Sequence, residues 1–292
     1  MSTKSRRILC AVGCLLAALV GFGLLLYPLV SNYLYETRQD GVLAEYLEQA
    51  DALRTDEERE AVLEAARQYN RQLSTGIRSL QDPFLTPTVV EADGEQRSIL
   101  DVTGTGVIAT LDIPTLSLTL PVYYGTDAET LERGIGVLEI SSLPVGGEGT
   151  HTVLCGHSGL SSAKLFSDLE LLETGDRFSI EVMGDTLTYT VDQITTVTPE
   201  DLSQLAILPG EDYCTLLTCT PFGVNTHRLL VRGTRIETPS EEKEAENIVS
   251  AEPVQSVWLR EYALSVLVSL AAVLGAVLVW RVVSLIRKRR RA

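Results

Sequence analysis

The sequence predicts a mainly β fold: a closed or nearly closed barrel of short strands, preceded by helices and flanked by two transmembrane helices. Three observations lead to this prediction. A long uncharged stretch lies near each terminus, a helical pattern follows the first of them, and residues 107–236 consist of short β-rich runs separated by Gly, Pro and Asp. Many short strands with such turn residues between them are typical of sandwiches and barrels.

Composition excludes several other classes of protein. The chain has 292 residues, 45% of them hydrophobic and 22% charged, which fits neither a disordered chain nor a membrane protein with many spans. It carries 24 Lys and Arg against 39 Asp and Glu, and many of the basic residues gather near the termini. The acidic central part argues against nucleic acid as a partner. Five Cys without a CxxC pair exclude a zinc ribbon and a disulfide-dense scaffold.

Two segments are expected to span a membrane. Ile8–Val30 and Tyr262–Trp280 contain no charge, and each is long enough to cross a hydrocarbon core about 30 Å thick. The alternative for the first is a cleaved signal peptide, but its apolar stretch is longer than usual and no clear A-x-A site follows. The alternative for the second is a buried helix, which the basic cluster Arg287–Arg291 opposes. Basic flanks outside both spans place both termini in the cytoplasm and residues 31–261 outside the cell.

Residues 36–75 are predicted to be helical. Thr55 and Glu58 match a capping box, and apolar residues then recur at helical spacing. Gly76 is the expected C-terminal stop. The Pro-containing segment 81–98 shows neither helical nor strand periodicity and is predicted to be a loop.

The central part contains seven β-rich runs and two short helical segments. The predicted strands are Val107–Ile113, Leu116–Val122, Thr150–Cys155, Arg177–Met183, Thr186–Val197, Tyr213–Cys219 and His227–Ile236. The short helices are Ala128–Arg133 and Ala163–Leu171, and Met183–Thr186 reads as a tight hairpin turn.

Few residues between the predicted spans can do covalent chemistry. A buried Cys is usually a small apolar residue, and Cys155 and Cys214 lie inside predicted strands. These two could form a disulfide if their strands are neighbours, although nothing in the sequence requires it. Cys219 differs because it ends an apolar strand and opens a loop, which makes it the candidate nucleophile.

Arg228 is the candidate partner of Cys219. If the last two predicted strands are antiparallel neighbours, both residues lie at the same end of the sheet. The positive charge of an arginine favours the thiolate, and its fork of donors can stabilise an oxyanion. A surface salt bridge is the alternative role for Arg228, and Arg232, on the same face, is the alternative arginine.

A cysteine nucleophile also needs an acid or base. His157 follows a predicted strand in a loop flanked by glycines, which is a favoured place for a catalytic residue. His151 and His227 lie near strand starts and remain alternatives, since a lone histidine is more often simply hydrogen-bonded or solvated.

These residues carry a family resemblance. The segment Thr215-Leu216-Leu217-Thr218-Cys219, with Arg228 nine residues on, resembles the TLxTC signature of sortases, the membrane-anchored cysteine transpeptidases of Gram-positive bacteria. Residues 156–166 and 219–233 are similar to segments of the class C, pilin-polymerising sortases. The resemblance covers about residues 36–286 and implies an eight-stranded barrel, N-terminal helices, a second span and a lid loop before the barrel.

The resemblance also implies roles for individual residues. Cys219 would be the nucleophile, His157 the general acid and base, and Arg228 the oxyanion-stabilising group. Asp82-Pro83-Phe84 matches the Asp-Pro-aromatic motif of the lid, so Asp82 is expected to contact Arg228 and Phe84 to cover Cys219. Many relatives have Trp where this chain has Phe84, and Asp-Pro alone is also common in ordinary turns.

The expected function is cleavage of an LPXTG-type sorting signal between Thr and Gly, and transfer of the Thr carbonyl to a lysine amine of another pilin subunit. The expected partners are LPXTG-bearing pilin subunits, an acceptor lysine or peptidoglycan amine, and membrane lipid, with no cofactor, metal or nucleic acid. Three alternatives remain: a sortase that attaches surface proteins to peptidoglycan, a hydrolytic cysteine protease, and a non-catalytic membrane-tethered barrel scaffold.

The predicted organisation has six parts. They are a cytoplasmic tip with the first transmembrane helix (1–35), an N-terminal helical region (36–80), the lid loop (81–98), the barrel (99–238), an acidic linker (239–257), and the second transmembrane helix with a basic cytoplasmic tail (258–292).

Overall fold

The computed structural model describes residues 3–52, 55–74, 82–84, 99–160, 162–238, 262–264, 266–271, 273, 275 and 277. The chain divides into two compact units, Leu29–Val254 and Met1–Pro28 with Gln255–Ala292. Most of the predicted lid loop, the acidic linker, part of the second predicted span and Gly76 lie outside the described residues. In the part of the chain that the structure describes, no helix is both long and apolar enough to cross a membrane, and the two spans stay a prediction.

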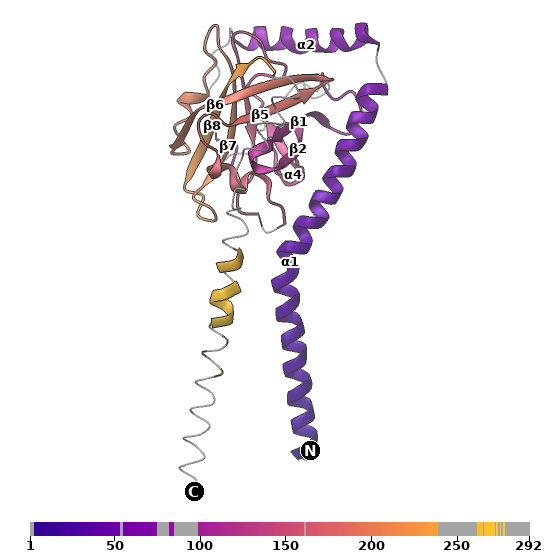
Figure 1. Cartoon of the computed structure of the whole chain (residues 1–292), viewed down its shortest axis with the longest axis vertical. Coiled ribbons are helices and arrows are strands. Elements are labelled where there is room, and N and C mark those ends of the chain that lie inside the picture. Colours follow the sequence, from indigo (N-terminus) through magenta and orange to yellow (C-terminus); the bar gives the residue numbers. More distant parts are fainter. Residues whose placement is uncertain are drawn as a thin grey trace. The chain divides into compact units, whose positions relative to one another are not determined.

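Within the described residues, eight strands close into a barrel (Figure 1). The strands are β1 (Val107–Ile113), β2 (Leu118–Tyr124), β3 (Ile135–Val137), β4 (Thr150–Cys155), β5 (Arg177–Val182), β6 (Asp185–Val197), β7 (Asp212–Thr220) and β8 (His227–Ile236). Their order around the barrel is β1-β2-β3-β4-β7-β8-β6-β5. The pairs β2–β3 and β4–β7 are parallel and the other pairs are antiparallel. The prediction of a mainly β barrel is therefore confirmed.

Several element boundaries differ from the prediction. β3 was not predicted, because three residues around a glycine carry no readable alternation. β2 begins two residues late because Pro114–Leu116 forms a 3-10 turn, η1, ending at Ser117 in the left-handed region with φ 47°. The predicted helix at 163–171 is the 3-10 helix η2 (Leu165–Leu171). The hairpin turn between β5 and β6 is confirmed, with Met183 and Gly184 both at positive φ, as a tight two-residue turn requires.

Two apolar clusters lie on opposite faces of the sheet. The larger cluster takes residues from every strand and fills the barrel, and it includes Leu154 of β4 and Leu216 of β7. The neighbours of these two residues, Val153 and Leu217, belong to a second cluster on the outer face. Because successive side chains of a strand point to opposite faces, the odd-numbered residues of β4 and β7 share that outer face. Cys219 belongs to this series.

The N-terminal region forms two helices, in agreement with the predicted N-terminal helices and with the capping box expected at Thr55 and Glu58. α1 spans Thr3–Ala52 and α2 spans Asp56–Ser74. The cause is the capping box itself: the Thr55 hydroxyl accepts from the Glu58 amide at 3.3 Å, and the Glu58 carboxylate accepts from the Thr55 amide at 3.2 Å. These bonds satisfy amides that a new helix leaves unpaired, so a helix begins there.

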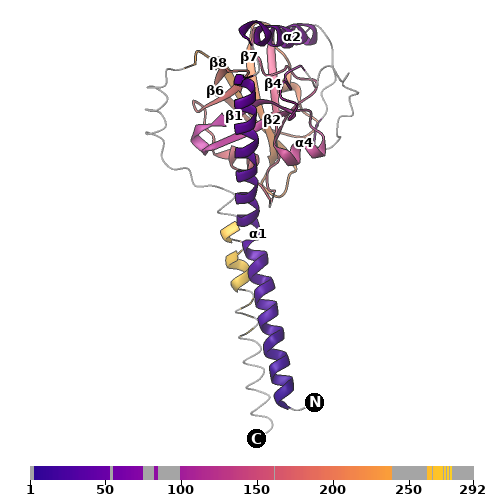
Figure 2. The same cartoon turned by 90° about the vertical axis from the view of Figure 1, so that its right-hand side faces the viewer.

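α2 lies across one end of the barrel (Figures 1 and 2). Leu63 and Ala66 are buried and belong to the cluster that fills the barrel. The Asn70 amide makes two hydrogen bonds to the backbone of Leu143, at 3.0 and 2.8 Å. One face of α2 thus closes the barrel, and its last described residue, Ser74, precedes Asp82 by only eight positions.

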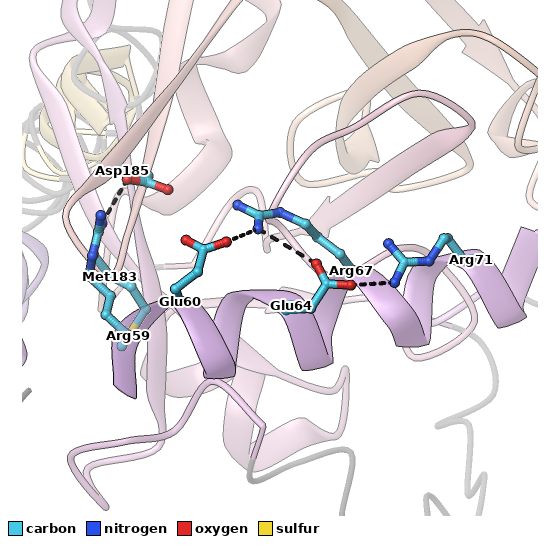
Figure 3. Close-up of polar contacts among 7 residues, drawn as sticks. All are labelled: Arg59, Glu60, Glu64, Arg67, Arg71, Met183 and Asp185. Carbon is cyan, nitrogen blue, oxygen red and sulfur yellow. Dashed lines mark hydrogen bonds and ion pairs between the residues drawn. The ribbon is translucent and has the colours of Figure 1, made fainter. Parts of the chain in front are cut away.

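The other contacts of α2 described here are made by its charged side chains. Arg59 reaches the β5–β6 turn and donates to the Met183 carbonyl at 2.9 Å and to Asp185 at 2.7 Å (Figure 3). On the same helix, Arg67 pairs with Glu60 and Arg71 with Glu64. Exposed pairs contribute about 0–1 kcal/mol each. The docking of α2 therefore depends mainly on its buried face.

Truncating the buried face of α2 tests this conclusion. Leu63→Ala should lower the free energy of unfolding by about 2–5 kcal/mol, because it leaves a cavity in the barrel core. The control Leu208→Ala removes a side chain that is 45% exposed and should have little effect. Chemical denaturation of the full chain measures both, and equal effects of the two variants would contradict the packing described here.

Candidate functional site

Cys219 and Arg228 lie opposite each other on neighbouring strands. β7 and β8 are antiparallel, and their register pairs Cys219 with Arg228. The antiparallel pairing expected from the sequence is therefore present. Both residues are buried, with Cys219 8% and Arg228 2% exposed. A thiol and a guanidinium thus lie together at one end of the sheet, and both are largely shielded from solvent.

His157 lies just beyond the end of β4, the strand next to the one that carries Cys219. β4 runs parallel to β7, and the last pair of their register is Cys155 with Leu217. The Gly156 amide extends the ladder by donating to the Leu217 carbonyl at 3.1 Å. His157 lies two residues after Cys155, and Cys219 lies two residues after Leu217. The parallel register therefore brings His157 and Cys219 to the same level along the two strands.

Each nitrogen of the Arg228 guanidinium makes at least one hydrogen bond. Its Nε donates to Asp82 Oδ1 at 2.9 Å and its Nη2 to Asp82 Oδ2 at 2.6 Å, a bidentate ion pair. Its Nη1 donates to the carbonyls of Asn225 and His227, at 3.1 and 2.9 Å. The Asp82 side chain is 4% exposed, so this pair is buried. Every nitrogen of the fork is occupied in this arrangement.

Phe84 contacts both neighbours of the thiol. Its ring centroid lies 5.6 Å from that of His157 and 5.3 Å from the guanidinium carbon of Arg228. The ring also packs against the outer apolar cluster. Asp82, Pro83 and Phe84 therefore lie over the end of the sheet that carries Cys219. The direct cover of Cys219 by Phe84 stays a prediction.

The other two barrel cysteines are structural in position. Within the described barrel, Cys155, Cys214 and Cys219 are all free thiols. Cys155 and Cys214 are also fully buried. Their strands are neighbours, but Cys214 is paired with Thr152 and Cys155 with Leu217. They also belong to opposite apolar clusters, so the disulfide left open by the sequence is absent from the described barrel.

The remaining candidates lie elsewhere. His151 is buried between the Ala206 carbonyl and the Thr215 hydroxyl, at 3.0 and 2.7 Å, and burial lowers its pKa to about 4. His227 is exposed and hydrogen-bonded to the adjacent Thr226. Arg232 forms its own bidentate pair with Asp192, at 3.0 and 2.8 Å.

Comparison with known proteins identifies the family. The family model for the sortase domain matches residues 111–236. Sortase A of Streptococcus agalactiae serotype III (strain NEM316) is 32% identical over 117 residues, which cover 39% of this chain and 47% of that protein, so the chain spans about half the length of this curated relative. The solved structure of sortase C-1 from Actinomyces oris is 42% identical, with a TM-score of 0.58 and coverage of 63% of this chain and 100% of that one.

The chain belongs to the sortase family. Sortase C of Streptococcus pneumoniae is a second close structural match, 40% identical with a TM-score of 0.62, covering 68% of this chain and 98% of that one. The resemblance to class C sortases found in the sequence is therefore confirmed at the level of three-dimensional structure.

The thiol of this sortase is protonated at neutral pH. Burial raises the pKa of Cys219 to about 11, the Arg228 charge opposes that rise, and the Asp82 charge adds to it. The sequence suggested a thiolate-favouring arginine. The Arg228 charge does act to lower the pKa of Cys219, but burial of the sulfur outweighs it and the Asp82 charge adds to the rise.

The neighbouring groups are also shifted. Burial lowers the pKa of His157, and the carboxylate of Glu132 on α4 (Ala128–Arg133) partly opposes this. Burial acts to lower the pKa of Arg228, but the hydrogen bonds from Asp82 and the nearby negative charges raise it overall. At neutral pH the site therefore holds a thiol, a neutral imidazole and an ion pair.

Some features of the site were not predicted. Glu132 lies on a short helix with no motif, and the carbonyls of Asn225 and His227 act through the backbone, which carries no sequence signal. Over the residues that the structure describes, no group of three or more His, Cys, Asp or Glu is arranged to hold a metal ion.

The high pKa of Cys219 predicts a steep pH dependence of its alkylation. Only the thiolate reacts, so the rate with iodoacetamide should rise about tenfold per pH unit from pH 7 to 9.5, without a plateau. Peptide mass spectrometry measures labelling at this residue, and the fully buried Cys214 serves as the unreactive control. A plateau by pH 8 would contradict the buried, lid-paired environment.

Proposed function

We propose that the chain is a membrane-anchored cysteine transpeptidase that polymerises pilin subunits. It cleaves an LPXTG-type sorting signal between Thr and Gly and joins the Thr carbonyl to the lysine amine of another subunit. The observation that carries the proposal is the meeting of Cys219, His157 and Arg228 at one end of three adjacent strands, under Asp82 and Phe84. The similarity to sortase C structures supports the pilin substrate, since the pneumococcal structure is described in terms of pilin substrate specificity.

In the proposed reaction, Cys219 attacks the Thr carbonyl carbon and transfers its proton to His157. The new C–S bond turns the carbonyl oxygen into an oxyanion, which Arg228 stabilises through its N–H donors. The C–N bond to Gly then breaks as the imidazolium gives its proton to the departing amine, leaving a thioester. The lysine amine attacks this thioester and loses a proton to His157, and the sulfur leaves with that proton restored.

The arrangement described above is a resting state of this cycle. Two nitrogens of Arg228 that would face the oxyanion are held by Asp82. Cys219 is 8% exposed, and its pKa is about 11. The lid segment therefore has to leave before the reaction begins. A covered site also limits the access of water, which competes with the amine for the thioester.

The proposed location is the cell membrane. Two spans, Ile8–Val30 and Tyr262–Trp280, would hold the barrel outside the cell with both termini in the cytoplasm. Substrates that are themselves tethered to the membrane would meet the enzyme there, and the bilayer lipid would be its anchor.

Mass spectrometry tests the function directly. The full chain mixed with an LPXTG-bearing peptide should gain the mass of the peptide up to Thr at Cys219, and Cys219→Ala should gain nothing. Addition of a lysine-containing pilin segment should release an isopeptide-linked product. Release only to water would indicate a hydrolase, and release only to a peptidoglycan amine would indicate the cell-wall sortase.

Arg228 should act through its fork as well as its charge. Arg228→Lys should slow thioester formation by about 10²–10³-fold, as the loss of an oxyanion donor does in other enzymes. Arg232→Lys is the matched control, because Arg232 lies on the same strand in a similar bidentate pair with Asp192. Rapid-quench measurement of the Cys219 thioester distinguishes them, and equal losses in both variants would argue against the assignment.

Removal of the lid contacts should activate the thiol. Asp82→Ala with Phe84→Ala removes a negative charge and a shielding ring, and both changes lower the pKa of Cys219. Alkylation at pH 7.5 should accelerate by at least tenfold. Asp192→Ala, which frees a different arginine of β8, should leave the rate unchanged. An unaltered rate in the double variant would exclude Asp82 and Phe84 as a lid.

A further inference from the structure

The backbone ladder between β4 and β7 stops where the reacting residues begin. Gly156 donates its amide to the Leu217 carbonyl at 3.1 Å, which directs the carbonyl of Leu217 toward β4. Carbonyls along a strand alternate between its two neighbours, so the Cys219 carbonyl also points toward the β4 side. A regular parallel ladder would place the Ser158 amide there as the next donor.

Two hydroxyl groups replace the missing part of the ladder. The Ser158 hydroxyl donates to the Cys219 carbonyl at 2.8 Å, and the Thr218 hydroxyl donates to the Gly156 carbonyl at 2.7 Å. Both serine and threonine are buried. The two bonds run in opposite directions between the same two segments, and they join the residues that flank His157 to those at Cys219.

The segment around His157 is closely packed. A Cβ atom on Gly156 would lie 2.6 Å from Ile135 and 2.7 Å from Phe166. Beyond His157, the Phe166 amide donates to the His157 carbonyl at 3.1 Å, and Gly159 turns the chain with φ +76°. The His157 loop is therefore held by η2 on one side and by the Ser158 hydroxyl on the side of the nucleophile.

We infer that Ser158 is a positioning residue for the proposed reaction: its hydroxyl bond to the Cys219 carbonyl fixes the separation of the His157 and Cys219 backbones. Cys219 is in turn paired with Arg228 on the neighbouring strand β8. The Ser158 hydrogen bond thus links the imidazole-bearing loop to the strand pair that carries the other two groups, on the far side of His157 from the Thr218 bond to Gly156. Proton transfer between sulfur and imidazole depends on that separation, whereas binding of the sorting signal does not. The inference rests on the proposed function.

The test separates acylation from binding. Single-turnover formation of the Cys219 thioester with an LPXTG peptide is measured in the full chain, with and without the lid substitutions. Ser158→Ala should lower the maximal rate by at least tenfold and leave the half-saturating peptide concentration within twofold. Ser158→Thr keeps a hydroxyl and should restore most of the rate. This split between rate and half-saturation is not expected of a residue that only supports the fold.

Ser141→Ala is the matched control. Ser141 is also a buried serine, which donates to the Leu138 carbonyl at 2.8 Å and accepts from the Val153 amide at 3.1 Å, on the same sheet. It should change stability without changing the maximal rate. Three results would overturn the inference. The maximal rate of Ser158→Ala could lie within twofold of the parent, it could fall no more than that of Ser141→Ala, or Ser158→Thr could fail to recover the rate. If the parent with the lid removed forms no thioester, the proposed function falls first and the inference with it.

Discussion

The positive charge of Arg228 is the constraint on which this site depends. Its guanidinium is nearly inaccessible to water, and a charge in such a place needs a partner. Asp82 supplies two parallel hydrogen bonds, and two backbone carbonyls satisfy the remaining nitrogen. Removing one member of a buried pair typically costs about 3–5 kcal/mol. The fork is therefore stable only when an anion occupies it, either the lid carboxylate or, in the proposed reaction, the oxyanion of the substrate.

The same requirement links the lid to the chemical state of the thiol. While Asp82 holds Arg228, the guanidinium gives Cys219 little net stabilisation of its thiolate, and burial dominates its pKa. Departure of the lid would remove a negative charge and admit water together. The barrel keeps the other distances fixed, since Cys219 and Arg228 are paired directly and His157 follows from a parallel neighbour. In the proposed function, exchange of the Asp82 carboxylate for the substrate oxyanion would couple activation of the nucleophile to substrate binding.

The sequence was sufficient for the longer strands and for the placement of Cys219 and Arg228 at one end of β7 and β8, because the short loop between these strands makes them antiparallel neighbours. It did reveal the start of α2, because the capping box at Thr55 and Glu58 is readable from residue types alone. It did not reveal β3, which is too short for a pattern. The pKa of Cys219 could not be predicted either. It depends first on the burial of the thiol and then on the charges of Arg228 and of Asp82, 137 positions earlier in the chain, and only the fold sets these.

A structure of the enzyme acylated at Cys219 by a sorting-signal peptide tests the central claim most directly. The account predicts that both Asp82 oxygens have left the guanidinium of Arg228, and that the carbonyl oxygen of the bound Thr lies within hydrogen-bonding distance of its N–H groups. An acylated enzyme in which the pair between Asp82 and Arg228 is intact, with the substrate carbonyl directed elsewhere, would contradict it.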